Sequence, residues 1–356
     1  ITTDNLATPS ITDGSKYFQP VLYTGSTSAQ DITFSGNSDL PPDWLWFKAR
    51  SGASDHFVFD KLRGVLKTIS TNDKTAEVTS TGSMTAFGTD GFSLGDGGSD
   101  NDINGVDGTT YVAWGWAANG SGSSNEDGTI NTTATSANTT AGFSISTYTG
   151  TGSGATVGHG LGVKPSVVLV KCFGTASTHW IINDWSGDYS NKLKLNENEA
   201  ASSSSGFVTA ASSTTFTLGT DTDVNGSSRT YVAYCFAEIP GYSKISSYTG
   251  NNNADGPFVY TDFAPAYVLW KNRTTAGNHW VVADRARSPK NVSVERLFPD
   301  LTNAESTSTA MCDFLSNGFK IRSTMGEINT SGDTIIYMAF AENPFGGGSI
   351  PPVTAR

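Results

Sequence analysis

The sequence predicts an all-β protein made of three tandem homologous β-sandwich domains, jelly-roll-like in type. Three observations predict this fold. Apolar runs are short and rarely follow a helical period, turn signals separate them, and one set of sequence anchors occurs three times in the 356 residues. Each copy spans about 100 residues, which is near the most frequent size of a domain.

Four anchors recur in the same order. Each copy begins with Tyr-Thr-Gly and continues with a proline, an apolar run and a lysine, and a histidine follows that lysine at a constant distance. An acidic residue comes shortly after the histidine, and each copy ends on a further strand. We interpret the repeated acidic residues as architectural. The lysine, histidine and acidic residues are Lys48, His56 and Asp60, then Lys171, His179 and Asp184, then Lys271, His279 and Asp284.

These anchors define the expected domain boundaries. The segment before the first anchor is polar, and the segment between the first two copies is rich in Gly, Ser and Thr, which is typical of a flexible linker or a long loop. The expected segments are a leader (1–17), repeat 1 (18–118), a linker (119–141), repeat 2 (142–240), repeat 3 (241–345) and a C-terminal tail (346–356).

Two kinds of strand support the sandwich. The run 167–170 is apolar on both faces and too short for a helix, as in a central strand. The closing strand 110–117 alternates, so that Val112, Trp114 and Trp116 share one face while small residues occupy the other. We expect the bulky face to fill a core and the bare face to let a second layer approach closely.

The composition excludes several classes of protein. Charged residues make up 15% of the chain and the net charge is −11, which argues against a nucleic-acid partner because phosphate binding depends on Lys and Arg. No apolar run approaches the length of a membrane-spanning helix, so we expect no membrane insertion. The three cysteines form no disulfide framework, and we expect Cys172 and Cys235 to be thiols in core strands.

Two loops resemble the first half of a calcium-binding loop, because oxygen-bearing side chains alternate before a glycine. The twelfth position, which normally holds a bidentate glutamate, is Tyr111 in one loop and Val232 in the other. The alternative is a solvated hairpin with Asn-Gly at its tip, and the only cofactor the sequence suggests is a weakly bound calcium ion. The residues concerned are Asp100, Asp102 and Asn104 in the first loop and Asp221, Asp223 and Asn225 in the second.

Trp185 and Tyr189 lie in a polar segment, and Trp185 has no counterpart tryptophan in the other copies. Aromatic rings stack on the C–H faces of sugars much as they pack on other rings. One hypothesis therefore makes this pair a carbohydrate-binding platform. The alternative is that Trp185 packs against its own domain.

The sequence shows no established catalytic pattern. It has no G-x-S-x-G, no H-E-x-x-H and no P-loop lysine, and each copy supplies one repeated histidine where a metal or catalytic site needs a cluster. We therefore predict no catalytic residues. The sequence does not exclude a pair of catalytic carboxylates for glycoside hydrolysis, because sandwich enzymes bring such residues together from distant strands.

The chain resembles tail-fibre-type virion proteins of marine tailed bacteriophages. The residues that carry the resemblance are the Tyr-Thr-Gly starts and the segments 5–10, 42–48, 313–320, 337–345 and 353–356. The resemblance covers essentially the whole chain. It implies a structural or host-recognition protein on the surface of an extracellular particle, in contact with other virion proteins and forming homo-oligomers such as trimers.

Three functions follow as hypotheses. The first is a non-enzymatic tail fibre or adhesin module that binds glycans on the host surface. The second is a protein that decorates the capsid or forms a head fibre, and the third is a tail enzyme that degrades polysaccharide. A binding module should have a groove with accessible aromatic rings, whereas an enzyme should hold two carboxylates about 5–10 Å apart in a cleft.

Overall fold

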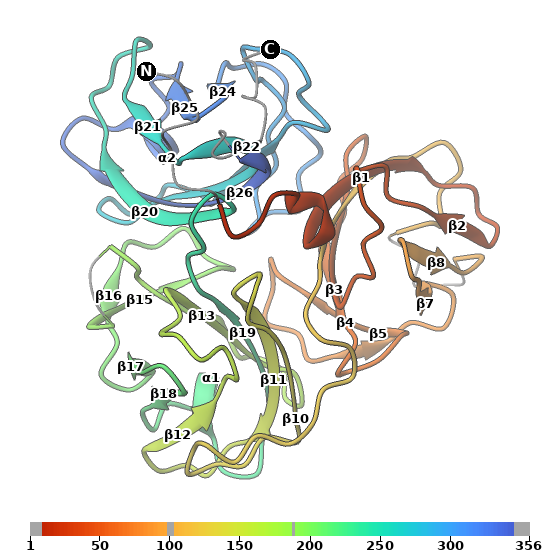
Figure 1. Cartoon of the computed structure of the whole chain (residues 1–356), viewed down its shortest axis with the longest axis vertical. Helices are drawn as coiled ribbons and strands as arrows, with labels where there is room; N and C mark the ends of the chain where they lie inside the picture. The colour runs from red at the N-terminus through yellow and green to blue at the C-terminus, as the bar shows by residue number, and fades with distance from the viewer. Residues whose placement is uncertain (1–8, 98–102, 187–188, 345–356) are drawn as a thin grey trace.

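Short alternating or fully apolar segments become strands throughout the chain. A computed structural model describes residues 9–97, 103–186 and 189–344. In these residues the fold is all-β, and the strands form six antiparallel sheets, of which three are large and three are small (Figure 1). The large sheets lie toward the middle of the molecule, and each small sheet lies at the periphery (Figure 1).

The first large and small sheets come from the N-terminal third of the chain. The first large sheet has the strand order β1 (Phe18–Thr24), β9 (Thr110–Trp116), β3 (Trp44–Ala49), β4 (His56–Asp60), β5 (Lys67–Ser70) and β6 (Val78–Thr79). The first small sheet has the order β2 (Gln30–Ile32), β8 (Phe92–Leu94) and β7 (Met84–Phe87).

The second pair of sheets follows in sequence. The second large sheet has the order β10 (Ala134–Asn138), β11 (Phe143–Thr149), β19 (Thr230–Phe236), β13 (Val167–Cys172), β14 (Trp180–Asn183), β15 (Asn191–Lys194) and β16 (Ser202–Ser203). The second small sheet has the order β12 (Ala155–Gly158), β18 (Thr215–Leu218) and β17 (Val208–Ala211).

The third pair completes the molecule. The third large sheet has the order β20 (Ser243–Thr249), β26 (Thr334–Pro344), β22 (Phe263–Asn272) and β23 (Val281–Asp284). The third small sheet has the order β21 (Phe258–Tyr260), β25 (Gly318–Ile321) and β24 (Cys312–Leu315). In all three large sheets the closing strand (β9, β19 or β26) lies between the strand that ends in Tyr-Thr (β1, β11 or β20) and the next long strand (β3, β13 or β22). The same strand order therefore occurs three times.

The bulky faces of the three large sheets pack against one another in a single shared aromatic core. Trp44 of β3 lies 4.9 Å from Tyr234 of β19, and Phe18 of β1 lies 5.5 Å from Tyr267 of β22, measured between ring centroids. Each such pair contributes about 0.5–1.5 kcal/mol beyond the area that it buries. The rings of this core include Phe18, Trp44, Trp116, Phe143, Tyr234, Phe236, Tyr267 and Phe340.

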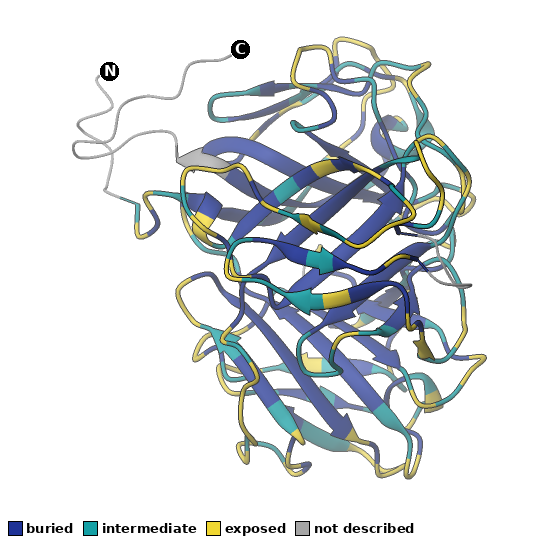
Figure 2. Cartoon of the chain, turned by 90° about the vertical axis from the view of Figure 1, so that its right-hand side faces the viewer, coloured by how far each residue is buried: buried dark blue, intermediate teal, exposed yellow. Residues whose placement is uncertain are grey.

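The small-residue faces of the closing strands meet the small sheets. At Gly115 of β9, a Cβ would lie 2.5 Å from the Phe34 ring, so only glycine allows this approach. Tyr23 and Phe47 of the first large sheet and Phe92 of the first small sheet are buried together between these layers. Figure 2 shows that the long strands are mostly buried, whereas the connections between strands are mostly exposed or half-buried.

Several expected strands are confirmed. The run 167–170 lies in β13, which is buried along its whole length, and the closing strand begins at Thr110 as β9. Cys172 of β13 and Cys235 of β19 are buried free thiols.

The hairpin that the Asn-Gly sequence suggests before the second closing strand is not formed. Residues 222–225 form the single helical turn α1 (Thr222–Asn225), with the Asp221 side chain as its N-cap, and α2 (Gly326–Asn329) occupies the corresponding place in the third part. Aspartate is a favoured N-cap, so the same polar residues that suggest a turn also start a helix. With the 3₁₀ turn η2 (Gly14–Lys16), these are the helices of the described residues, and none has the length and apolar character for a membrane span.

The segments expected to be a leader and a linker are partly ordered. Residues 119–141 include β10, which pairs with β11 and extends the second large sheet. Ile11 and Ser15, placed in the polar leader, are buried. Residues 1–8 and the expected tail 346–356 lie outside the described residues. Polar composition is typical of loops, but an edge strand such as β10 needs few apolar residues.

Candidate functional site

The three repeated acidic residues join neighbouring large sheets. The hydroxyl of Tyr234 in β19 donates to Asp60 at 2.7 Å, and the indole N–H of Trp114 in β9 donates to Asp284 at 3.0 Å. The third residue, Asp184, accepts from Arg273 at 2.6 Å instead. The closing-strand position that holds Trp114 and Tyr234 holds Met338 in β26, and methionine has no N–H or O–H to donate. This geometry supports the architectural interpretation of the acidic residues.

Two of these carboxylates also hold buried arginines. Asp60 lies 2.5 Å from Arg63, Asp284 lies 2.6 Å from Arg287, and all four side chains are almost fully buried. Burial alone would lower the pKa of Arg63, but the adjacent carboxylate of Asp60 raises it above its ordinary value. These groups therefore act as fixed ion pairs inside the protein.

The repeated lysines are buried as well. Lys171 Nζ donates to the carbonyl oxygen of Thr178 at 2.6 Å, and Lys271 Nζ donates to that of Asn278. Lys48 Nζ reaches across to the third part of the chain and donates to the carbonyl oxygen of Thr302 at 3.1 Å. Burial lowers the pKa of Lys171 and of Lys271 to about 8.

Because of these lowered pKa values, the protein should become more stable as the pH rises from 7.5 to 9.5. In this interval the folded state releases the proton of Lys171 while the unfolded state keeps it, so the unfolded state binds more protons. We expect the free energy of unfolding to rise by about 1–2 kcal/mol for this lysine. Urea titrations at both pH values measure the rise.

In the variant Lys171→Met, the free energy of unfolding should rise less between pH 7.5 and 9.5, because the contribution of Lys171 is missing. The matched control is Lys290→Met, which removes an exposed lysine and should leave the pH dependence as it is in the parent protein. An equal rise in the parent protein and in Lys171→Met would contradict the assignment.

The calcium hypothesis is not supported by the geometry at Asn225. Its amide oxygen accepts from the backbone N–H of Thr151 at 2.9 Å, and its amide nitrogen donates to the carbonyl oxygens of Ser153 and Gly219. Asn104 and Asn329 make the same three kinds of contact in the first and third parts. The asparagine therefore ties two loops together, and this structural role accounts for Asn104 and Asn225 without a cation.

The remaining residues of the calcium hypothesis are used locally or lie outside the described structure. Asp221 accepts from the backbone N–H of Asp223, and Asp223 accepts from that of His179. Asp100 and Asp102 lie outside the described residues. In the parts of the chain that the structure describes, no group of three or more His, Cys, Asp or Glu residues is arranged to hold a metal ion.

Trp185 and Tyr189 do not form an accessible platform. Both side chains are buried, with 9% and 6% of their surface exposed. The Trp185 indole N–H donates to the carbonyl oxygen of Tyr337 in β26, and the Tyr189 hydroxyl donates to that of Pro165. Trp185 thus joins the second large sheet to the third. Trp185 and Tyr189 both line one pocket of about 180 Å³, and their small accessible surfaces lie beside it.

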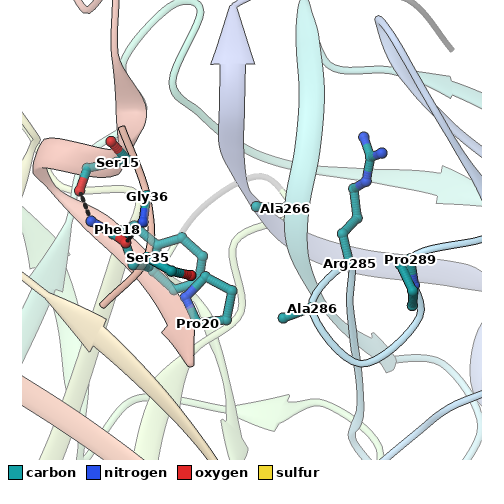
Figure 3. A pocket seen from close by; sticks show the side chains of 10 residues that line it. Ser15, Phe18, Pro20, Ser35, Gly36, Ala266, Arg285, Ala286 and Pro289 are labelled. Atoms are coloured by element: carbon teal, nitrogen blue, oxygen red, sulfur yellow. Dashed lines mark hydrogen bonds between the residues drawn. The ribbon is translucent and has the colours of Figure 1, made fainter. Parts of the chain in front are cut away.

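A pocket opens where the first and third large sheets meet (Figure 3). Its volume is about 200 Å³, and Arg285 is the one charged residue that lines it. Phe18 and Pro20 stand on one side, and Arg285 rises along the opposite wall (Figure 3). We call this the junction pocket and define it by Phe18, Pro20, Ala266, Arg285, Ala286 and Pro289.

A second pocket, of about 180 Å³, occupies the corresponding place between the second and third large sheets. Trp185 lines it as Arg285 lines the junction pocket, and each of these residues directly follows its repeated aspartate. Ile245 of β20 stands where Pro20 stands in β1, since their partners Met338 and Trp114 hold the same position in the closing strands. The two pockets are therefore equivalent places in the architecture.

The third equivalent place is covered. Lys61, which directly follows Asp60, forms an ion pair with Asp43 at 3.2 Å. Asp43 also accepts from the backbone N–H groups of Ala118 and Gly120. The connection that leads from β9 to β10 therefore runs across this junction.

One family match covers almost the entire described structure. The family is described as "Domain of unknown function (DUF7483)", and it matches residues 13–344. The chain belongs to the DUF7483 family. The match includes all three large sheets, so in DUF7483 the shared unit is the whole three-sheet arrangement. No curated protein and no solved structure shows significant similarity to the chain.

Sequence reasoning missed the junction pocket of this DUF7483 member. Phe18, Pro20 and Arg285 come from distant parts of the chain, and none of them belongs to a catalytic motif. One signal was available: the residue after each repeated aspartate differs, being Lys61, Trp185 or Arg285. Because this residue varies beside a constant aspartate, it indicates a position at which the three parts of the chain differ in function.

Proposed function

We propose that the chain consists of three tandem homologous β-sandwich repeats, jelly-roll-like in type, at 18–118, 142–240 and 241–345. The recurring strand order supports this division, as do the equivalent contacts of Asn104, Asn225 and Asn329. The repeats share one core, so we expect them to fold as one body.

We propose that this protein is a non-enzymatic structural protein of a bacteriophage virion, a tail fibre or adhesin module that binds glycans on the host surface. It would lie on the outside of the particle, contact other virion proteins and assemble with further copies of itself, as trimers in the resembling proteins. Two features support a structural role. The repeated lysines and aspartates make internal contacts, and the three large sheets share one core.

The junction pocket is the observation that carries glycan binding. Pro20 and Pro289 offer apolar surface to the C–H face of a sugar, and Arg285 adds a charged residue to the opposite wall. A pocket of about 200 Å³ is smaller than the roughly 300–1,000 Å³ of sites for drug-sized ligands. This size suits a single sugar ring at the end of a glycan.

The proposal is tested by binding of the full chain to purified host surface polysaccharide. Ala286→Phe would fill the junction pocket and should abolish binding at this site, while Ser186→Phe, at the equivalent place in the second repeat, should keep it. Thermal unfolding shows whether both variants stay folded. No binding by the parent protein, or release of reducing sugar from the polysaccharide, would contradict the proposal.

A further inference from the structure

Two aromatic side chains are exposed on one strand of the third small sheet. Phe258 and Tyr260 of β21 have 48% and 50% of their surface exposed, and Val259 between them is buried. Alternation along a strand puts Phe258 and Tyr260 on the same, outward face, about 7 Å apart. These are the two aromatic residues among the exposed large hydrophobic side chains of the described residues.

The corresponding strands of the other small sheets carry no such rings. Val259 pairs with Phe319, as Val157 pairs with Phe216 in the second small sheet and Ile32 pairs with Phe92 in the first. These pairs align the strands. The positions of Phe258 and Tyr260 are then held by Thr156 and Gly158 in β12, and by Asp31 and Thr33 in and after β2. Only one of three equivalent faces is aromatic, so the common fold does not require these rings.

The residues that flank the two rings on the neighbouring strand are polar or lack a side chain. Tyr260 lies opposite Gly318, which adds no side chain beside the ring, and Phe258 lies opposite Lys320. A side chain at Gly318 would collide with the backbone of Val259, since its Cβ would lie 2.0 Å from that carbonyl oxygen. The space that Gly318 leaves beside Tyr260 is therefore built into the sheet.

The charges beside the rings nearly cancel. Lys320 lies 2.9 Å from Asp255, and Arg322 lies 2.6 Å from Asp313 and 3.3 Å from Asp255. The Tyr260 hydroxyl donates to Asp262 at 2.6 Å. Two cations and three carboxylates offer both donors and acceptors without a dominant sign. Such a face matches a ligand that is uncharged and rich in hydroxyl groups, and it does not favour a polyanion.

We propose that this outward face, which we call the β21 face and define by Phe258, Tyr260, Lys320 and Arg322, binds a neutral polysaccharide chain. The two rings stack on successive sugar rings along the strand, and the neighbouring charged side chains hydrogen-bond to the hydroxyl groups. The proposal rests on the glycan-binding function and assigns it a second surface, distinct from the junction pocket. Two weak surfaces on one molecule raise the overall affinity through avidity.

The test uses the full chain and two probes, the neutral glucan laminarin and the polyanion alginate, in affinity electrophoresis. The variant Phe258→Thr/Tyr260→Thr carries a residue that the chain itself has at each equivalent position, Thr156 and Thr33. We expect the parent protein to be retarded by laminarin regardless of salt concentration, and the variant to bind at least about tenfold more weakly. Ala286→Phe, which leaves the β21 face intact, should keep laminarin binding.

Several results would overturn the β21 site. None of them decides the proposed function, which has its own test with host polysaccharide. Unchanged laminarin binding by the double variant would overturn the β21 site, as would laminarin binding that Ala286→Phe abolishes. So would salt-sensitive binding to alginate alone. If the double variant instead shifts an oligomer to a monomer in sedimentation, the β21 face is an interface between protein copies. Circular dichroism confirms that both variants are folded.

Discussion

The variant Asp60→Asn should lower the free energy of unfolding by about 3–5 kcal/mol, which is the usual effect of removing one partner from a buried ion pair. Asp60 and Arg63 are both almost completely buried at 2.5 Å from each other. Without the carboxylate, the buried Arg63 guanidinium keeps only the partly exposed Glu77, 3.3 Å away, as a counter-charge. The hydrogen bond from Tyr234 also loses its charged acceptor, which weakens the contact between the first and second large sheets.

The structure offers a matched control at the equivalent position. Asp184 pairs with Arg273, whose side chain has 23% of its surface exposed, so water can solvate the arginine when the carboxylate is lost. Asp184→Asn should therefore cost less than half as much stability as Asp60→Asn. Chemical denaturation followed by circular dichroism measures both losses. Equal losses would show that burial of the partner does not decide the effect.

The variant Trp44→Ala should have an effect of similar size, about 3–5 kcal/mol. The Trp44 ring is buried and lies 4.6 Å from Trp116 in its own sheet and 4.9 Å from Tyr234 in the second large sheet, between centroids. Truncation leaves a cavity in the core that all three large sheets share. We expect a lower denaturation midpoint and weaker near-ultraviolet circular dichroism from the remaining core rings.

Trp44→Phe is the companion variant. The Trp44 indole N–H has no hydrogen-bond partner in the described part of the chain, so phenylalanine keeps an aromatic ring and gives up no hydrogen bond. We expect a loss well below that of Trp44→Ala. If Trp44→Ala unfolds at the same denaturant concentration as the parent protein, the shared core does not hold the sheets together.

Strand positions were predictable because they depend on local pattern. The run 167–170 is apolar on both faces and lies in the buried strand β13, and the alternation after Thr110 places Trp114 and Trp116 on one face of β9. The same local reasoning failed at residues 222–225, because Asp221 suits the N-cap of a helix as well as a turn.

Candidate sites were predictable only where the function of a residue is local. Trp185 has a polar sequence neighbourhood, but its ring is buried by β26, which lies about 150 residues away in sequence. The oxygen of Asn225 faces the backbone of Thr151, although the spacing of its own loop matches that of a cation ligand. Contacts of this range leave no periodic trace, so the sequence could not reveal them.

The sequence by itself determined that the chain is all-β, which strands are buried, and where lysine and aspartate recur, because side-chain alternation and turn chemistry act over a few residues. Only the tertiary structure decided that the bulky strand faces share one core, and that two equivalent junctions between sheets hold a pocket while the third holds an ion pair. Those outcomes depend on how three separately encoded sheets pack against one another. The packing is set by the sum of many weak contacts between residues that are far apart in the chain.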